Sequence, residues 1–239
     1  MQHLMFLFLR RKWEQDESYM NRVLQYYEDI DYPLQLYMFP EGTDMYALSI
    51  KRSNEHAEKF NLAKYKNVLH PRVTGFTHLV QRLREKSVDF IHDITVGYPV
   101  NLCYGEMDLV RGNLPKEIHV YMQKYPISEL PEDAEGIGQW CQDRWREKEA
   151  RLDNLYSENK FPDNERIADS KIETTARRTN YLVLLYWTAF LFLCFYGFWA
   201  WSLFRWITLF GIIFFSYKSV QGGMDKLQLD RHFNQVKRE

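Results

Sequence analysis

The sequence predicts an α/β domain, with a mostly parallel sheet and flanking helices, followed by a C-terminal membrane helical hairpin. Over residues 1–130, short apolar runs alternate with polar runs that have helical spacing, which is typical of α/β domains. In residues 181–217, 30 of 37 residues are hydrophobic and the only charge is Arg205. The chain therefore combines a domain of ordinary soluble composition with a segment suited to a lipid bilayer.

Composition excludes several classes of protein. The net charge of −1 excludes a generally basic nucleic-acid binder, and the absence of a Gly-rich phosphate loop disfavours a nucleotide-binding enzyme. Three cysteines lie far apart with no Cys-x-x-Cys or Cys/His cluster, so neither a disulfide framework nor a metal site is expected.

The elements of the α/β domain follow from local pattern. Strands are expected at the apolar, β-rich runs Leu4–Leu9, Leu34–Phe39, Phe90–Tyr98 and Glu117–Tyr125. Helices are expected where apolar residues recur at helical spacing, in Glu14–Asp29, Ser53–Tyr65 and about Thr74–Glu85. The apolar pair Val68–Leu69 precedes the last of these helices.

The C-terminal half predicts a different organisation. Residues 134–159 predict a long amphipathic helix, because the following apolar residues fall largely on one face: Ile137, Trp140, Cys141, Trp145, Leu152 and Leu155. We therefore divide the chain into an α/β domain (1–130), a long helix (131–160), a linker (161–180), a membrane segment (181–217) and a cytosolic tail (218–239).

The membrane segment is long enough for at least one crossing. Residues 181–204 supply 24 residues without a charge, and about 20 suffice to span the hydrocarbon core. Basic residues flank both sides, among them Arg178 and Lys218, so both ends are expected on the cytosolic side. This favours a transmembrane or re-entrant hairpin over a single span.

Three stretches could carry chemistry. The run FPEGT (39–43) breaks a strand at Pro40 and presents Glu41, Gly42 and Thr43 at the strand end, where α/β proteins bind ligands. Taken alone, this run is also an ordinary turn. The segment LHPRVTGF (69–76) opens a helix, and its Arg72 would suit a phosphate, although a simple surface charge is the alternative.

The third stretch is FLRR (8–11), in which basic residues follow the first expected strand. Its Arg11 could bind a phosphate through a bidentate guanidinium contact, whereas a lone basic cluster is usually a solvated strand end.

Together, these stretches resemble conserved motifs of the PlsC-type glycerophospholipid (1-acylglycerol-3-phosphate) acyltransferases. FPEGT resembles their third motif, FLRR their second, and LHPRVTGF the fourth-motif region of the lysocardiolipin acyltransferase branch. RSNEHAEK (52–59) and HDITVGYP (92–99) also read like that branch. The resemblance covers roughly residues 4–160, so the α/β domain is expected to be part of a glycerolipid-acyltransferase domain.

The resemblance implies transfer of an acyl group from acyl-CoA to a lysophospholipid hydroxyl, with a lysophosphatidylinositol or lysocardiolipin-like acceptor. Glu41, Gly42 and Thr43 would shape the acceptor and phosphate site, Arg11 would bind phosphate, and Pro71 and Arg72 would lie in the loop beside the donor. Acyl-CoA would serve as co-substrate without a further cofactor. The resemblance also implies the endoplasmic reticulum membrane, with the domain facing the cytosol.

One departure from the family pattern concerns the general base. The family uses a His five residues before an Asp, and none of the seven histidines here meets that spacing. We therefore expect a chain truncated before Met1, with little or no turnover of its own. A catalytically inactive, membrane-anchored lipid-binding or regulatory isoform is the alternative.

Two histidines are possible substitutes for the missing base. His92 precedes Asp93 directly, but neighbouring residues of a strand point to opposite faces, so Asp93 is not expected to orient the His92 ring. His70, beside the fourth-motif loop, is the weaker candidate.

Overall fold

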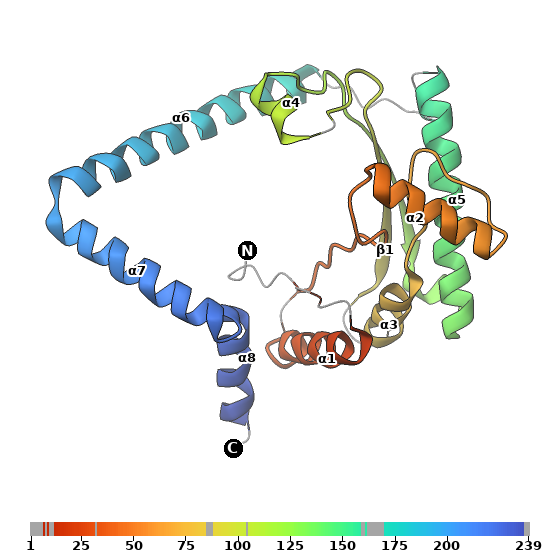
Figure 1. Cartoon of the computed structure of the whole chain (residues 1–239), viewed down its shortest axis with the longest axis horizontal. Coiled ribbons are helices and arrows are strands. Elements are labelled where there is room, and N and C mark those ends of the chain that lie inside the picture. The colour runs from red at the N-terminus through yellow and green to blue at the C-terminus, as the bar shows by residue number, and fades with distance from the viewer. Residues whose placement is uncertain are drawn as a thin grey trace. The chain divides into compact units, whose positions relative to one another are not determined.

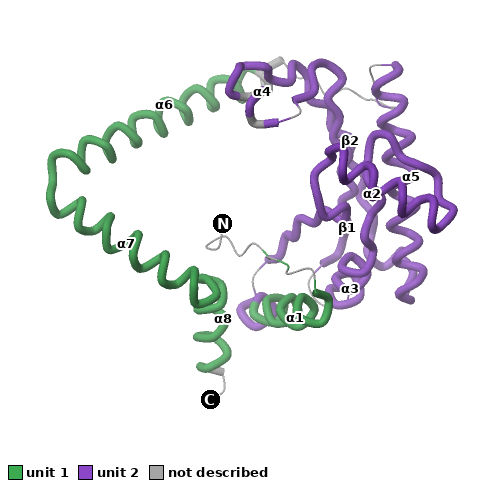
Figure 2. Tube along the Cα trace, viewed as in Figure 1, with its two compact units in different colours: residues 1–26, 165–239 green, residues 27–164 purple. Residues whose placement is uncertain are grey.

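The computed structural model describes residues 7, 9, 12–31, 33–84, 88–103, 105–158, 161 and 170–236 (Figure 1). The chain forms two compact units: residues 27–164, and residues 1–26 together with 165–239 (Figure 2). Arg11 and most of the strand expected at Leu4–Leu9 lie outside the described residues.

The unit formed by residues 27–164 contains a small sheet and several helices. In chain order its elements are α2 (Ala47–Lys59), α3 (Val73–Leu83), β1 (Phe90–Gly97), α4 (Glu106–Val110), β2 (His119–Pro126), a 3-10 turn (Ile127–Glu129) and α5 (Ala134–Glu158). The helices expected near residues 74–85 and 134–159 are thus confirmed as α3 and α5.

The sheet corrects the expected fold class. The described residues form a two-stranded antiparallel sheet, with Phe90 opposite Pro126 and Gly97 opposite His119, in place of a mostly parallel one. A parallel connection needs a long crossover, usually a helix, whereas the described part of 98–118 contains only the five-residue α4. The two strands themselves lie where the sequence predicts them.

Residues 34–39 do not form the strand expected there. Their side chains alternate between half-buried and exposed, with Tyr37 and Phe39 exposed. Alternation describes an extended segment, but a strand also needs a hydrogen-bonded partner, and none is present for 34–39 within the described ranges.

The sheet packs its polar face against α5. Asp93 and Thr95 are buried on that face, where Gly97 also lies against Leu152 and Leu155 of α5. Two apolar clusters complete the core: one contains Val68, Leu152, Leu155 and Phe161, and the other contains Val80, Ile127, Leu130 and Ile137. The opposite face carries the exposed side chains of Ile94, Val96, Val120 and Met122.

The second unit contains most of α1 (Trp13–Asp29) together with α6 (Ser170–Ala200), α7 (Ser202–Val220) and α8 (Gly223–Val236). α1 begins where the Lys12 backbone N–H donates to Asp16. It then docks on α8: the Tyr19 hydroxyl donates to Asp225 at 2.6 Å, and Arg22 pairs with Asp230 at 2.6 Å.

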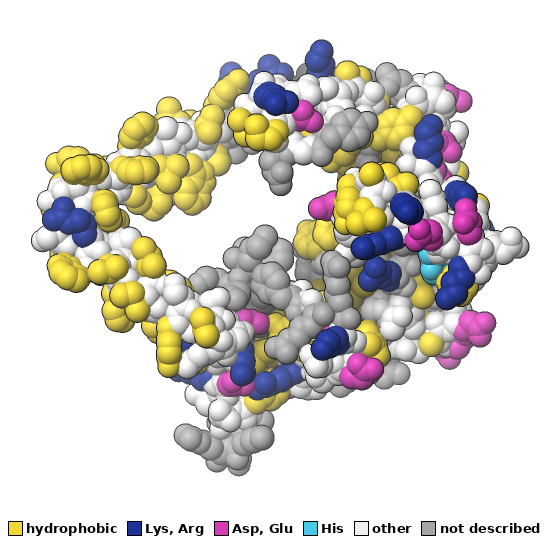
Figure 3. Space-filling model, viewed as in Figure 1, with side chains coloured by type: hydrophobic (Ala, Val, Ile, Leu, Met, Phe, Trp, Pro, Cys, Tyr) yellow, Lys and Arg dark blue, Asp and Glu magenta, His cyan; other side chains and the backbone are white. Residues whose placement is uncertain are grey.

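By length and composition, two helical stretches suffice to cross a membrane, namely Thr174–Ala200 and Ser202–Val220. α6 begins at Ser170, within the stretch 161–180 for which a linker was expected. Trp201 adopts an extended backbone between the two helices, which diverge from this bend in Figure 1. Most of their apolar side chains are exposed, as the yellow surface of Figure 3 shows.

Candidate active site

Two of the three stretches singled out in the sequence meet in the structure. The Arg72 backbone N–H donates to the Pro40 carbonyl at 2.8 Å, and the Leu69 N–H donates to Oε2 of Glu41 at 3.3 Å. The FPEGT turn and the LHPR segment are therefore joined by direct hydrogen bonds, although they lie about thirty residues apart in the sequence.

Glu41 is the centre of this arrangement. Its second carboxylate oxygen, Oε1, accepts a hydrogen bond of 3.0 Å from the indole N–H of Trp145 on α5. Burial raises the pKa of the Glu41 carboxyl, and the bonds from Trp145 and Leu69 and the charge of Lys148 oppose that rise. Glu41 thus ties three segments together while each of its oxygens keeps one lone pair.

Gly42 has a φ of +70°, which lies in the left-handed region of backbone conformation that favours glycine. A Cβ at this position would lie 3.8 Å from Cδ and 3.9 Å from Nε of Arg72, so the arginine side chain runs alongside Gly42. Arg72 and Thr43 are exposed, whereas Pro71 is buried. Arg72 and Thr43 therefore contribute an accessible guanidinium and an accessible hydroxyl to the turn that contains Glu41.

Arg72 is also the N-cap residue of α3, and its side chain makes no capping hydrogen bond to that helix. The first backbone N–H groups of α3 lack helical partners and carry partial positive charge. A guanidinium next to a helix N-terminus favours an anion such as a phosphate. The predicted phosphate role of Arg11 remains a prediction, because Arg11 lies outside the described residues.

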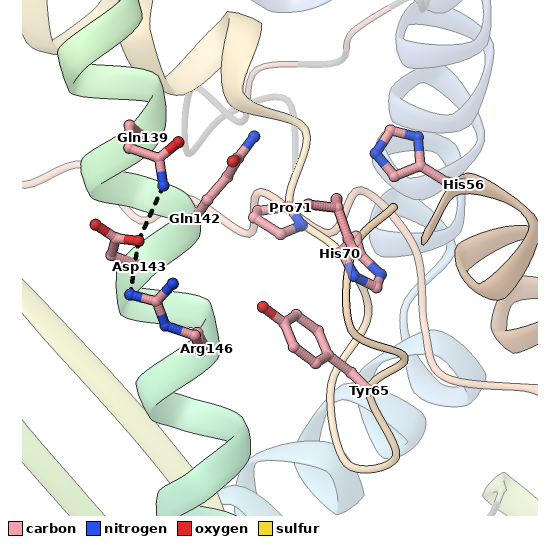
Figure 4. A pocket seen from close by; sticks show the side chains of 9 residues that line it. His56, Tyr65, His70, Pro71, Gln139, Gln142, Asp143 and Arg146 are labelled. Atoms are coloured by element: carbon pink, nitrogen blue, oxygen red, sulfur yellow. Dashed lines mark hydrogen bonds and ion pairs between the residues drawn. The ribbon is translucent and has the colours of Figure 1, made fainter. Parts of the chain in front are cut away.

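Beside this region lies an open pocket between α5 and the segment that ends at Pro71 (Figure 4). Gln139, Gln142, Asp143 and Arg146 line its α5 side, and Tyr65, His70 and Pro71 face them. Arg146 pairs with Asp143 at 2.9 Å, so much of the charge in the pocket is neutralised.

His70 is fixed at both ring nitrogens. Nε2 lies 3.0 Å from the Ala63 carbonyl, which can only accept a hydrogen bond, and Nδ1 lies 2.8 Å from the Ser53 hydroxyl. We therefore assign the proton to Nε2. Burial lowers the pKa of His70, an effect that the Ala63 carbonyl opposes, and Tyr65 stacks on the ring with centroids 4.3 Å apart. This environment makes His70 a structural histidine with no free nitrogen for proton transfer.

His92 and Asp93 point to opposite faces of β1, as their adjacency predicts. His92 is exposed, whereas Asp93 is buried and pairs with Lys148 and Arg151 of α5. Asp93 cannot orient the His92 ring, so these two residues do not form a substitute for the family's catalytic pair.

Sequence reasoning missed the contribution of α5. Trp145 holds Glu41, and Lys148 adds a charge that acts on it. The signal was present in the helical spacing: residues 141, 145, 148, 152 and 155 follow one stripe, so Lys148 was a candidate for the buried face together with Trp145.

The structure predicts that Glu41→Ala destabilises the unit formed by residues 27–164. Removing the carboxylate leaves the Trp145 and Leu69 N–H groups without their acceptor, which costs about 1–3 kcal/mol. Urea-dependent proteolysis of the full chain in detergent would measure the loss, with the exposed Thr43→Ala as the control. Equal stability of the two variants would contradict the assigned role of Glu41.

Comparison with known proteins places these features in a family. Residues 108–188 match the family model described as "Acyltransferase C-terminus". The chain is 44% identical over 237 residues to lysocardiolipin acyltransferase 1 of Gallus gallus, covering 97% of this chain and 63% of that protein. It is 41% identical to the Mus musculus protein of the same name, covering 96% and 62%.

A further relative is lysophosphatidylinositol acyltransferase 10 of Caenorhabditis elegans, 35% identical over 92% of this chain and 59% of that protein. The chain thus spans about six tenths of the length of these relatives. No solved structure matches it significantly.

Proposed function

The chain belongs to the glycerophospholipid acyltransferases, in the lysocardiolipin acyltransferase branch, and from that premise we propose that it serves acyl transfer from acyl-CoA to a lysophospholipid hydroxyl. The observation that carries the proposal is the bonded pair of motifs. Pro40 and Glu41 accept hydrogen bonds from Arg72 and Leu69, which brings the acceptor-side and donor-side motifs into one place.

In this proposal the two motifs take different substrates. Glu41 and Thr43 contact the hydroxyl and phosphate groups of the acceptor, and Gly42 allows the chain to turn beside them. Arg72, exposed at the start of α3, attracts a phosphate of the acyl-CoA. Pro71, which is buried, holds the donor-side loop in position.

The reaction needs a base. As the acceptor oxygen attacks the thioester carbonyl, its proton passes to the base, the carbon–sulfur bond breaks and the CoA thiolate leaves and takes up a proton. The family's His-x4-Asp pair is absent from these 239 residues, and His70 and His92 do not replace it. We therefore propose that these residues alone turn over little or no substrate.

The acceptor is proposed from the names of the relatives, which act on lysocardiolipin or lysophosphatidylinositol. We place the protein in the endoplasmic reticulum membrane, with residues 27–164 on the cytosolic side. The two apolar helices and the basic residues that flank them support this placement. Membrane residence would bring the site to its lipid acceptor.

The missing His-x4-Asp pair also supports a second candidate: a catalytically inactive, membrane-anchored protein that binds phospholipid. It would keep the Glu41–Arg72 arrangement and bind acceptor without transfer. Acyl transfer after a base has been supplied separates the two candidates.

The test supplies the base. The full chain in vesicles, given lysophosphatidylinositol or lysocardiolipin and radiolabelled acyl-CoA, should form no labelled phospholipid above background. A fusion with an upstream segment of a relative that carries His-x4-Asp should form it readily. In that fusion, Arg72→Ala should lower kcat/KM by about tenfold or more, because it removes a charged phosphate contact.

Controls make the outcome decisive. Lys51→Ala, an exposed change on α2, should leave the fusion's rate unchanged. Robust transfer by the chain alone would show that the base is present after all. A folded fusion that binds acceptor but transfers nothing would favour the inactive lipid-binding protein.

A further inference from the structure

The loop between the two strands exposes an unusual number of apolar side chains. Residues 98–118 contain α4, and among their described side chains five large apolar ones are each more than a third exposed: Leu102, Met107, Val110, Leu114 and Ile118. Val110 reaches 77% exposure. In Figure 3, hydrophobic side chains lie over α4 together with charged ones of both signs. Grouped apolar exposure of this kind marks a binding surface.

The same loop is held together by its polar groups. The Asn101 amide donates to Oδ1 of Asn113 at 2.8 Å and to the Leu114 carbonyl at 2.7 Å, and the Lys116 N–H donates to the Val100 carbonyl at 3.2 Å. The Cys103 thiol donates to the Asn113 carbonyl. Polar groups therefore order the inside of the loop while its apolar groups face outward, the reverse of a loop built for water.

The apolar surface continues onto the sheet. Ile118, Val120 and Met122 alternate along the chain, and all three are exposed on the face that is opposite to α5. The exposed charged side chains of the loop, which flank its apolar residues, include the cations Arg111 and Lys116 and the acid Glu117. Apolar side chains bordered by charged groups match the interface of a bilayer, where hydrocarbon lies beneath polar head groups, and the two cations among them can meet lipid phosphates.

Chain connectivity favours a lipid surface over other occupants. Phe161 is 2% exposed and lies against His119 and Tyr121, at the end of β2 that follows the loop. Only nine residues further along, α6 begins at Ser170, and even a fully extended chain covers no more than ~32 Å in nine residues. Chain length thus limits how far Phe161, at the loop end of the hairpin, can lie from the start of the first helix that could span a membrane.

We propose that the loop 98–118 is a membrane-interfacial element, which inserts its apolar side chains into the surface of the bilayer that holds α6 and α7. The inference goes beyond acyl transfer and does not depend on it. Insertion would fix the height of the hairpin above the membrane and hold the unit formed by residues 27–164 against the lipid.

The test follows a label in the loop of the full chain. Cys103→Ser and Cys194→Ser leave Cys141, which is buried, and Val110→Cys then receives an environment-sensitive fluorophore. The chain is reconstituted in phosphatidylcholine vesicles, with and without doxyl-labelled lipid. We expect blue-shifted emission that doxyl lipid quenches by about twofold or more. A label at Glu55→Cys on α2, which is exposed, should be neither shifted nor quenched.

A second variant tests the mechanism. Met107→Asp adds a charge to the inserted surface and should reduce the quenching at position 110, while circular dichroism shows an unchanged helical content. A label at 110 that emits as in water would overturn the proposal. Blue-shifted emission without lipid quenching would also overturn it. If the blue shift is then lost when the protein is diluted in lipid, a second copy of the chain covers the loop. If the blue shift persists on dilution, another segment of the same chain covers it.

Discussion

Replacing Asp93 with alanine should lower the free energy of unfolding by about 3–5 kcal/mol, the largest effect that we expect from any single substitution. Asp93 is 7% exposed and pairs with Lys148 and with Arg151, the latter at 3.0 Å. Lys148 and Arg151 are 6% and 9% exposed. The substitution would leave two cations buried on the sheet face without their carboxylate.

The other hydrogen bonds of Lys148 and Arg151 explain why these two cations cannot easily adjust to the loss of Asp93. Lys148 also donates to the Ile94 carbonyl at 2.8 Å, and Arg151 donates to Gln123 at 3.2 Å and to Glu147 at 2.9 Å. Burial opposes a charged Arg151, but its hydrogen bond to Asp93 and the nearby charge of Asp93 raise the pKa of its guanidinium overall. Neither cation can move to water without breaking further bonds.

Amide hydrogen exchange of β1 and α5 in the detergent-solubilised full chain would measure the effect as a loss of opening free energy. Glu55→Ala is the matched control, because Glu55 pairs with Lys51 at the exposed surface over 4.0 Å and should change stability by less than ~1 kcal/mol. Replacing Asp93, Lys148 and Arg151 together with apolar residues should recover most of the loss. If Asp93→Ala costs no more than Glu55→Ala, the buried network is not as described.

The second large effect concerns the close contact between β1 and α5 at Gly97. A Cβ on Gly97 would overlap Cδ2 of Leu155 and lie 3.2 Å from Cδ2 of Leu152. Gly97→Ala should therefore cost about 1–3 kcal/mol through overpacking. Leu155→Ala should cost about 2–5 kcal/mol, because Leu155 is 0% exposed and its loss leaves a cavity.

The double variant distinguishes this contact from general damage. In Gly97→Ala with Leu155→Ala, the new methyl group occupies space that the shortened side chain vacates. The combined cost should therefore fall below the sum of the single costs by about 1 kcal/mol or more. Gly105→Ala is the control, since its Cβ would meet nothing within 4 Å. Additive costs in the same exchange experiment would contradict the contact.

Part of the candidate site was predictable from the sequence because it depends on short-range chemistry. Pro40 and Gly42 define a turn after an extended run, and Gly42 does adopt the positive φ that glycine allows. α3 begins at Val73, one residue before the start expected at Thr74, and Arg72 is its N-cap residue. The partners of Glu41 were not predictable in this way, because Trp145 lies 104 residues away and was assigned only to an apolar helix face.

The sequence by itself determined several local elements of this protein, although not the strand expected at residues 34–39 or the bounds of α2. Helical spacing predicted α3 and α5, β-rich runs predicted β1 and β2, and the long apolar segment predicted a membrane association. Each of these depends on residues a few positions apart, or on length against a bilayer of known thickness.

Only the tertiary structure decided how these elements combine. Strand direction depends on the connection and the partner, so the sheet is antiparallel where a mostly parallel one was expected. Burial depends on what packs against each residue. Lys148 and Arg151 of α5 are therefore buried together with Asp93, whereas Val120 and Met122 are exposed. Hydrogen-bond geometry and burial arise from contacts across the chain, which local periodicity does not encode.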